Sequence, residues 1–183
     1  MIDVVKIIQT KAFARQDGAI LGIVWITSFA CTMLAVSPEH SILGIIANIL
    51  LLSTPFVVAK RLKSFRDYAL DGTISFRRGL FYCAQTFFCA TLLLTIVQYL
   101  WFRFMNTNEF LFQLQAQYKL MMQAYQMTSE ETKTLLEALS MMKPIAWASM
   151  FMITDLIAGA ILSPIIAALM ARKVTKQQIF NQQ

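Results

Sequence analysis

Charged residues are scarce in this sequence: Asp, Glu, Lys and Arg make up 14% of its 183 residues, whereas 57% are hydrophobic. A soluble domain carries about 25% charged residues, so this chain has too little polar surface to face water on all sides. Its mean hydropathy is +0.58, and the apolar residues form long blocks instead of scattered positions. The composition therefore argues against a soluble globule and indicates a lipid bilayer as the solvent.

Residues that carry catalytic or metal chemistry are equally sparse. The sequence has one histidine, His40, and three cysteines, Cys31, Cys83 and Cys89, which lie inside apolar blocks without CxxC spacing. It contains no HExxH, GxSxG or Walker-type pattern. We therefore predict no catalytic residue, no metal site and no cofactor.

Four apolar blocks are present, and each contains about 19 residues or more. That length is enough to cross a hydrocarbon core of about 30 Å at 1.5 Å per helical residue. The sequence predicts an all-α membrane protein, a four-helix transmembrane bundle that forms a single domain over residues 1–183. The predicted spans are 18–36, 41–59, 80–102 and 145–170.

The distribution of basic residues predicts the orientation of these spans. Twelve of the 16 Lys and Arg residues fall in the segment before the first span, in the linker 60–79 and in the C-terminal tail. Because basic residues accumulate on the cytoplasmic side, we expect both termini in the cytoplasm and the segment 103–144 outside. The tail residues in this count are Arg172, Lys173 and Lys176.

The outer segment 103–144 carries two helical patterns. Apolar residues recur at helical spacing at Phe110, Leu114, Tyr118, Met121 and Tyr125. A second pattern begins with Thr128-x-x-Glu131, which has the form of a capping box. We predict two amphipathic helices, about 109–126 and 130–142, whose apolar stripes pack together, lie on the membrane surface, or bind a partner or ligand.

The linker 60–79 is the most distinctive stretch. We expect the second helix to continue to about Leu70, a turn at Asp71-Gly72, and a cap of the third helix by Ser75. The basic side chains either set the topology or bind anionic lipid headgroups, each contributing about 1 kcal/mol. They are Lys60, Arg61, Lys63, Arg66, Arg77 and Arg78.

A family resemblance rests on the same linker. The residues that carry it are Arg66, Asp67, Tyr68, Asp71, Gly72, Ser75 and Gly79. With the long outer segment and a final helix that ends in basic residues, this run resembles the domain-of-unknown-function 4199 family, small membrane proteins found mainly in the Bacteroidetes. The resemblance implies a bacterial inner-membrane location and no established activity or catalytic residue. It points toward cell-envelope biology, with a membrane glycosyltransferase as a candidate partner.

Asp155 is the one ionisable residue deep inside a predicted span. A charged Asp there costs about 2.5–3.5 kcal/mol on insertion scales, so we expect it to be protonated or partnered. Counting depth along the helices gives Asn48, Thr95 and Gln98 as candidate members of one polar layer. This layer is either a structural clamp between helices or a proton or substrate site. The two main functional hypotheses are a non-catalytic scaffold or accessory subunit, and a small transporter or channel-like oligomer built around Asp155. A membrane enzyme that uses lipid-linked substrates is a third option.

Overall fold

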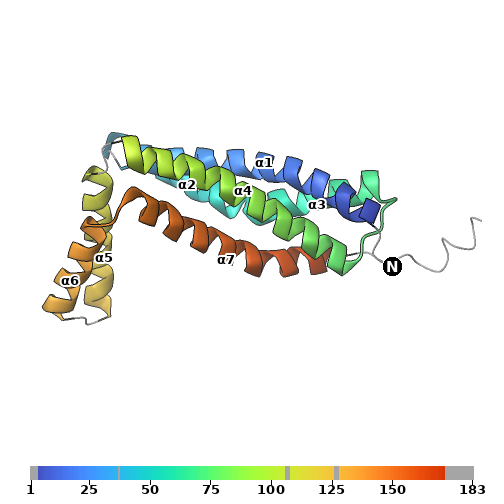
Figure 1. Cartoon of the computed structure of the whole chain (residues 1–183). Coiled ribbons are helices and arrows are strands. Elements are labelled where there is room, and N and C mark those ends of the chain that lie inside the picture. Colours follow the sequence, from blue (N-terminus) through green and yellow to red (C-terminus); the bar gives the residue numbers. More distant parts are fainter. Residues whose placement is uncertain (1–3, 37, 106–107, 126–127, 172–183) are drawn as a thin grey trace, which may run out of the picture.

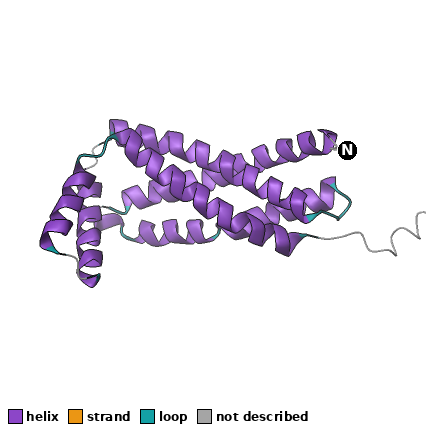
Figure 2. Cartoon of the chain, turned by 60° about the horizontal axis from the view of Figure 1, so that its bottom comes forward, coloured by secondary structure: helices purple, strands orange, loops and turns teal. Residues whose placement is uncertain are grey.

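The computed structural model describes residues 4–36, 38–105, 108–125 and 128–171, and every regular element in them is helical. The predicted C-terminal basic residues Arg172, Lys173 and Lys176 lie outside the described residues. Figure 2 shows the helices and the short loops that join them. The elements are α1 (Val4–Leu34), η1 (Pro38–His40), α2 (Ile42–Leu52), α3 (Thr54–Ala69), α4 (Phe76–Phe104), α5 (Asn108–Ala124), α6 (Ser129–Ser140) and α7 (Pro144–Met170).

Four helical stretches in the described residues are long and apolar enough to cross a membrane: Val5–Leu34, Ile42–Ala69, Phe76–Phe104 and Pro144–Met170. They run side by side, and α5 and α6 stand across one end of the bundle (Figure 1). This confirms the predicted class, four spanning helices with two further helices between the third and the fourth. We call the end with α5 and α6 the capped end and the opposite one the basic end.

Helix α4 lies between α1 and α7 and packs along both. Glycines allow this close approach. A Cβ atom at Gly18 of α1 would lie 2.7 Å from the Cβ of Cys89, and one at Gly159 of α7 would lie 2.8 Å from the Cβ of Phe87. Since real Cβ atoms do not approach so closely, these two contacts fix the spacing of the three helices.

The second span is interrupted between α2 and α3. Pro55 at the start of α3 has no N–H to donate, and its ring is incompatible with a regular preceding turn. The break at Ser53 is bridged locally, since the Ser53 hydroxyl donates to the Leu50 carbonyl at 2.6 Å. From α1, the Trp25 Nε1–H donates to the Thr54 hydroxyl at 2.9 Å. In contrast, α7 continues through Pro164 as one helix.

Two apolar cores hold the bundle. The larger core includes the fully buried Leu21, Leu62 and Tyr82 nearer the basic end and extends toward the capped end as far as Trp25 and Leu94. The smaller core lies at the capped end, where Phe102 stacks on Trp147 with ring centroids 5.9 Å apart. Large apolar side chains elsewhere on the spans are exposed on the outside of the bundle, as expected of surfaces that face lipid.

Helices α5 and α6 pack on each other and on the capped end. Phe110, Leu114 and Tyr118 of the predicted stripe join the smaller core, whereas Tyr125 is 76% exposed. Helix α6 begins with the predicted capping box, in which the Thr128 hydroxyl accepts from the Glu131 N–H. Part of this stripe therefore packs on the bundle.

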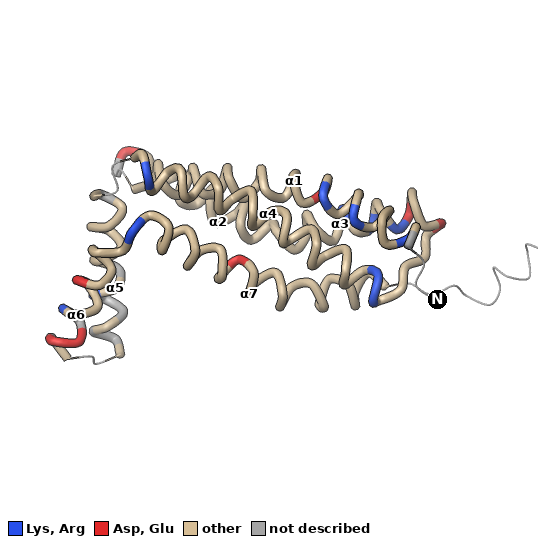
Figure 3. Tube along the Cα trace, in the orientation of Figure 1, with Lys and Arg blue, Asp and Glu red and all other residues tan. Residues whose placement is uncertain are grey.

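Charges are distributed unevenly over the bundle. Figure 3 shows Lys and Arg concentrated where α1, α3 and α4 meet at the basic end, with few along the middle of the helices. One acidic position interrupts the uncharged middle of α7, and this is Asp155. These two regions contain the candidate site residues.

Candidate functional site

Two members of the predicted polar layer line one cavity. Gln98 of α4 and Asp155 of α7 border a partly enclosed cavity of about 270 Å³ in the half of the bundle nearer the capped end. We call it the Asp155 cavity. Its described walls come from α1, α2, α4, α5 and α7: Trp25, Ser28, Phe29, Thr32, Met33, Leu51, Leu94, Gln98, Phe110, Leu114, Phe151 and Asp155.

The other two members lie elsewhere. Asn48 borders a neighbouring cavity of about 310 Å³, and its side-chain amide donates to the Gly44 carbonyl of its own helix at 2.9 Å. Thr95 donates to the Thr91 carbonyl, also within its own helix, at 2.8 Å. Depth alone therefore groups residues that face different ways around their helices.

The two cavities share one wall. Thr32 of α1 and Phe110 and Leu114 of α5 border both of them. Next to these residues, the Gln113 side-chain amide of α5 donates to the Val36 carbonyl in the turn that follows α1. Helix α5 therefore covers the Asp155 cavity and is attached to the bundle beside it.

The polar groups of the Asp155 cavity fall into two kinds. Ser28 donates to the Ala47 carbonyl at 2.9 Å, and Thr32 donates to the Ser28 carbonyl at 3.0 Å. Gln98 is 97% buried, yet its Oε1 atom and the Oδ2 atom of Asp155 are buried without a hydrogen-bond partner in the described part of the chain. The serine and threonine donors are committed to carbonyls, whereas these two oxygens are free to accept.

The predicted basic cluster divides into exposed and internal side chains. Lys60, Lys63 and Arg77 are exposed and are the members able to meet lipid headgroups. Arg66 is 97% buried. Arg78 reaches back to α1, where its Nε–H donates to the Thr10 hydroxyl at 2.9 Å and Nη2 donates to Gln9 Oε1 at 2.8 Å.

Arg61, the remaining member, approaches an acidic residue that the sequence analysis did not single out. Its Nε lies 3.5 Å from Asp17 Oδ1. The buried Tyr82 hydroxyl donates to Asp17 Oδ2, and the Tyr82 ring stacks on Phe65 with centroids 5.1 Å apart. Asp17 directly precedes the first predicted span. An acidic residue at that boundary, on the same side as a basic linker, is the feature of the sequence that could have indicated an ion pair with the linker.

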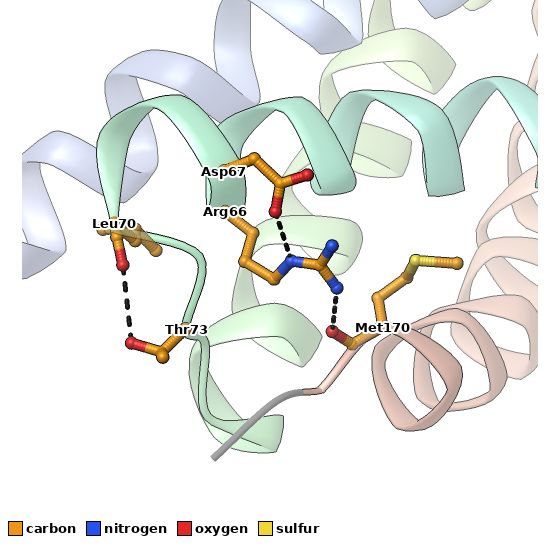
Figure 4. Close-up of polar contacts among 5 residues, drawn as sticks. All are labelled: Arg66, Asp67, Leu70, Thr73 and Met170. Atoms are coloured by element: carbon orange, nitrogen blue, oxygen red, sulfur yellow. Dashed lines mark hydrogen bonds and ion pairs between the residues drawn. The ribbon is translucent and has the colours of Figure 1, made fainter. Parts of the chain in front are cut away.

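The family-like residues form the corner between α3 and α4 (Figure 4). The Arg66 guanidinium donates from Nε to Asp67 Oδ1 at 2.7 Å and from Nη1 to the Met170 carbonyl at the end of α7 at 3.1 Å. The turn follows at Asp71 and Gly72, with φ of +51° and +77°. Gly72 N–H returns to the Arg66 carbonyl at 3.0 Å. Arg66 thus joins the corner to α7.

The other members of the motif complete this corner. Ser75 caps α4 by accepting from the Arg78 N–H, as predicted, and the buried Gly79 packs against Ala167 of α7. The Thr73 hydroxyl bonds the Leu70 carbonyl at 3.4 Å (Figure 4). Tyr68 differs from the rest because it is 91% exposed. The motif therefore builds a structural joint and supplies no cluster of reactive groups.

Within the described residues, no three His, Cys, Asp or Glu side chains gather into a group that could hold a metal ion. All three cysteines are free thiols.

Comparison with known proteins agrees with the resemblance seen in the sequence. A family model described as "Protein of unknown function (DUF4199)" matches residues 16–172, nearly the whole chain. No curated protein and no solved structure matches.

Proposed function

The chain belongs to the DUF4199 family of proteins of unknown function, and we propose that it is a non-catalytic membrane protein that binds a membrane-resident ligand in the Asp155 cavity. The pair of buried, unpartnered oxygens on Gln98 and Asp155 carries the proposal. A buried polar group left without a partner costs about 1–3 kcal/mol. A ligand that donates hydrogen bonds to these two oxygens recovers this cost when it binds.

The surroundings of the cavity support this role. Its walls are mostly apolar with a few convergent polar groups, which is typical of small-molecule sites. Toward the basic end, the helices close on a packed core that includes Leu21, Leu62 and Tyr82. The cavity is therefore a pocket in one half of the bundle, which favours binding over a passage through a single chain.

We place this pocket in the outer half of a bacterial inner membrane, with both termini in the cytoplasm. The support is the excess of Lys and Arg at the basic end together with the positive-inside rule. Labelling of a cysteine introduced into α6, applied from outside intact cells, tests this orientation. If that cysteine is labelled only after the cells are opened, α6 lies in the cytoplasm and the proposed orientation is wrong.

Native mass spectrometry of the full chain, released from the membrane in mild detergent, tests the binding function. We expect the wild-type protein to retain an additional small molecule, and Leu94→Trp, which fills the cavity from α4, to lose it. Leu92→Trp is the matched control, because Leu92 is 43% exposed on the same helix while Leu94 is 6% exposed. Equal retention by both variants would contradict the proposal.

A role as scaffold or accessory subunit in cell-envelope biology is the second candidate. It is favoured by apolar side chains that are exposed on α5 and in the loops after α5 and after α6, including Phe112 at 74%, Tyr125 at 76% and Met141 at 80%. A membrane glycosyltransferase is the candidate partner. Affinity purification of wild type and Phe112→Ser tests it: a stoichiometric partner lost with the variant supports this role, and the same set of proteins from both opposes it.

A small transporter or channel-like oligomer would use the same cavity. Such a role requires copies of the chain to complete a path past the packed core at the basic end. Flux measured in proteoliposomes separates it from binding alone, since transport predicts solute or proton movement that is lost in Asp155→Asn.

A further inference from the structure

The hydroxyl and indole hydrogen-bond donors around the Asp155 cavity are already used. The Trp25 Nε1–H bonds Thr54, the Ser28 hydroxyl bonds the Ala47 carbonyl, and the Thr32 hydroxyl bonds the Ser28 carbonyl. The bond from Trp25 joins α1 to α3, and the bond from Ser28 joins α1 to α2. The bond from Thr32 stays within α1. The hydroxyl and indole groups of the walls therefore offer a ligand little donor capacity.

Two hydrogen-bond acceptors at the cavity, in contrast, have no partner among the described residues. Gln98 Oε1 and Asp155 Oδ2 have no partner in the described part of the chain, and no hydrogen bond joins these two side chains there. Among the described residues that border the cavity, none is a Lys or Arg. A carboxylate in apolar surroundings is stabilised most by a cation that also donates hydrogen bonds, and the described residues that border the cavity supply none.

The remaining walls are apolar. Phe29 and Met33 of α1, Leu51 of α2, Leu94 of α4 and Phe151 of α7 surround the two polar residues. At about 270 Å³, the cavity is close to the lower limit of small-molecule sites, about 300–1,000 Å³. This size suits one polar group with a single alkyl chain better than a two-chain phospholipid.

We propose that the Asp155 cavity selects a single-chain amphiphile whose polar group is a protonated amine. The ammonium donates to Asp155 and Gln98, and its alkyl chain lies against the apolar walls. This inference rests on the proposed binding function and adds the chemical class of the ligand. Selectivity comes from the two free acceptors, because an ammonium has three donors, an alcohol has one and a carboxylate has none.

Three probes of equal chain length test the proposal: decylamine, decanol and decanoate. Each is titrated against the full chain in nanodiscs of zwitterionic phosphatidylcholine, and the thermal unfolding midpoint is followed by tryptophan fluorescence, since a ligand that binds the folded state raises it. We expect decylamine to bind most tightly, decanol less tightly and decanoate least. Asp155→Asn should weaken decylamine by about tenfold or more, the effect of losing a charge-assisted hydrogen bond, and should leave decanol nearly unchanged.

Two further variants complete the test. Glu137→Gln removes an exposed carboxylate on α6 and should not alter decylamine binding, which controls for general attraction of cations to the protein. Gln98→Leu should weaken decylamine and decanol together, and it replaces Asp155→Asn as the decisive variant if that protein does not fold.

The outcomes separate the two proposals. If decanol or decanoate binds as tightly as decylamine, or if decylamine binds equally to wild type, Asp155→Asn and Gln98→Leu, the amine class is wrong. Stabilisation by sodium ions that depends on Asp155, without any response to the three probes, would also overturn it. If Leu94→Trp binds all three probes as wild type does, the cavity is not the binding site and the proposed function itself fails.

Discussion

Replacing Arg66 by Ala is expected to loosen the joint between α3 and the end of α7. Arg66 is 97% buried, and its guanidinium bonds Asp67 at 2.7 Å and the Met170 carbonyl at 3.1 Å. Asp67 is adjacent in sequence and 38% exposed at its side chain. The contact with Met170 therefore connects distant parts of the chain, whereas the contact with Asp67 is local.

The structure sets the size of the effect. Losing the bond to Met170 leaves a carbonyl at the end of a helix without its partner, which costs about 1–3 kcal/mol. The local bond to Asp67 contributes about 0.2–1 kcal/mol. Loss of the packed alkyl stem of Arg66 destabilises the fold further. The variant no longer has the free-energy cost of burying the guanidinium charge, and this partly offsets the loss. We expect a net loss of about 2–4 kcal/mol in the free energy of unfolding.

Unfolding by sodium dodecyl sulfate in mixed micelles, followed by tryptophan fluorescence, measures this loss. Lys63→Ala is the matched control, because Lys63 is an exposed basic residue on the same helix and its removal should change stability by about 0.5 kcal/mol or less. Equal stabilities for Arg66→Ala and Lys63→Ala would refute the structural role of Arg66. An inverted orientation in Arg66→Ala would show instead that this residue acts as a topology signal.

Two other predictions concern packing and capping. Gly159→Ala should destabilise the bundle by about 1–3 kcal/mol, because the added Cβ would lie 2.8 Å from the Cβ of Phe87. Gly44→Ala is the control and should be tolerated in the same unfolding assay, because its added Cβ would have its nearest neighbour at 3.5 Å. Equal losses of stability in the two variants would contradict the packing of α4 on α7. In α6, hydrogen bonds from the Thr128 backbone and hydroxyl lower the pKa of Glu131 from its ordinary 4.5. The capping box is therefore complete above pH 4.5 and weakens as the pH falls through the lowered pKa. Hydrogen exchange of α6 should show this loss of protection at acid pH in wild type and not in Thr128→Ala, and equal behaviour of the two would contradict it.

The spans and the local signals were predictable because they depend on short stretches of sequence. A block of 19 or more apolar residues has few alternatives to a spanning helix. The capping box at Thr128 and the cap at Ser75 are confirmed. The turn at Asp71-Gly72 is also confirmed by two positive φ angles. Each of these features is decided by residues within a few positions of one another.

The site was less predictable because it depends on how each helix is rotated. Counting residues gives depth at 1.5 Å per residue, and it placed Gln98 and Asp155 in one layer. It could not show that Asn48 and Thr95 bond their own helices and do not border the Asp155 cavity. Rotation is set by close contacts such as Gly159 on Phe87, which no property of a single helix reveals.

The basic linker also shows that the sequence alone does not reveal which side chains make contacts inside the bundle. Its six cations appeared equivalent in the sequence, but Arg66 and Arg78 make internal hydrogen bonds. An arginine can donate several bonds in a fixed plane, which makes it able to join helices as well as to face a membrane surface. Only the positions of Met170 and Thr10, each more than sixty residues away in sequence, distinguish the two uses.

The two ends of the bundle therefore call for different kinds of explanation. At the basic end, the residues that identify the family form a joint whose polar groups bond one another or the ends of helices. At the capped end, a cavity retains two oxygens with no partner in the described chain, beneath a helix attached beside it. A motif that satisfies its own hydrogen bonds preserves a fold, whereas the two free oxygens carry the proposal of a ligand site. Experiments on function should therefore begin at Asp155 and Gln98, and experiments on folding at Arg66.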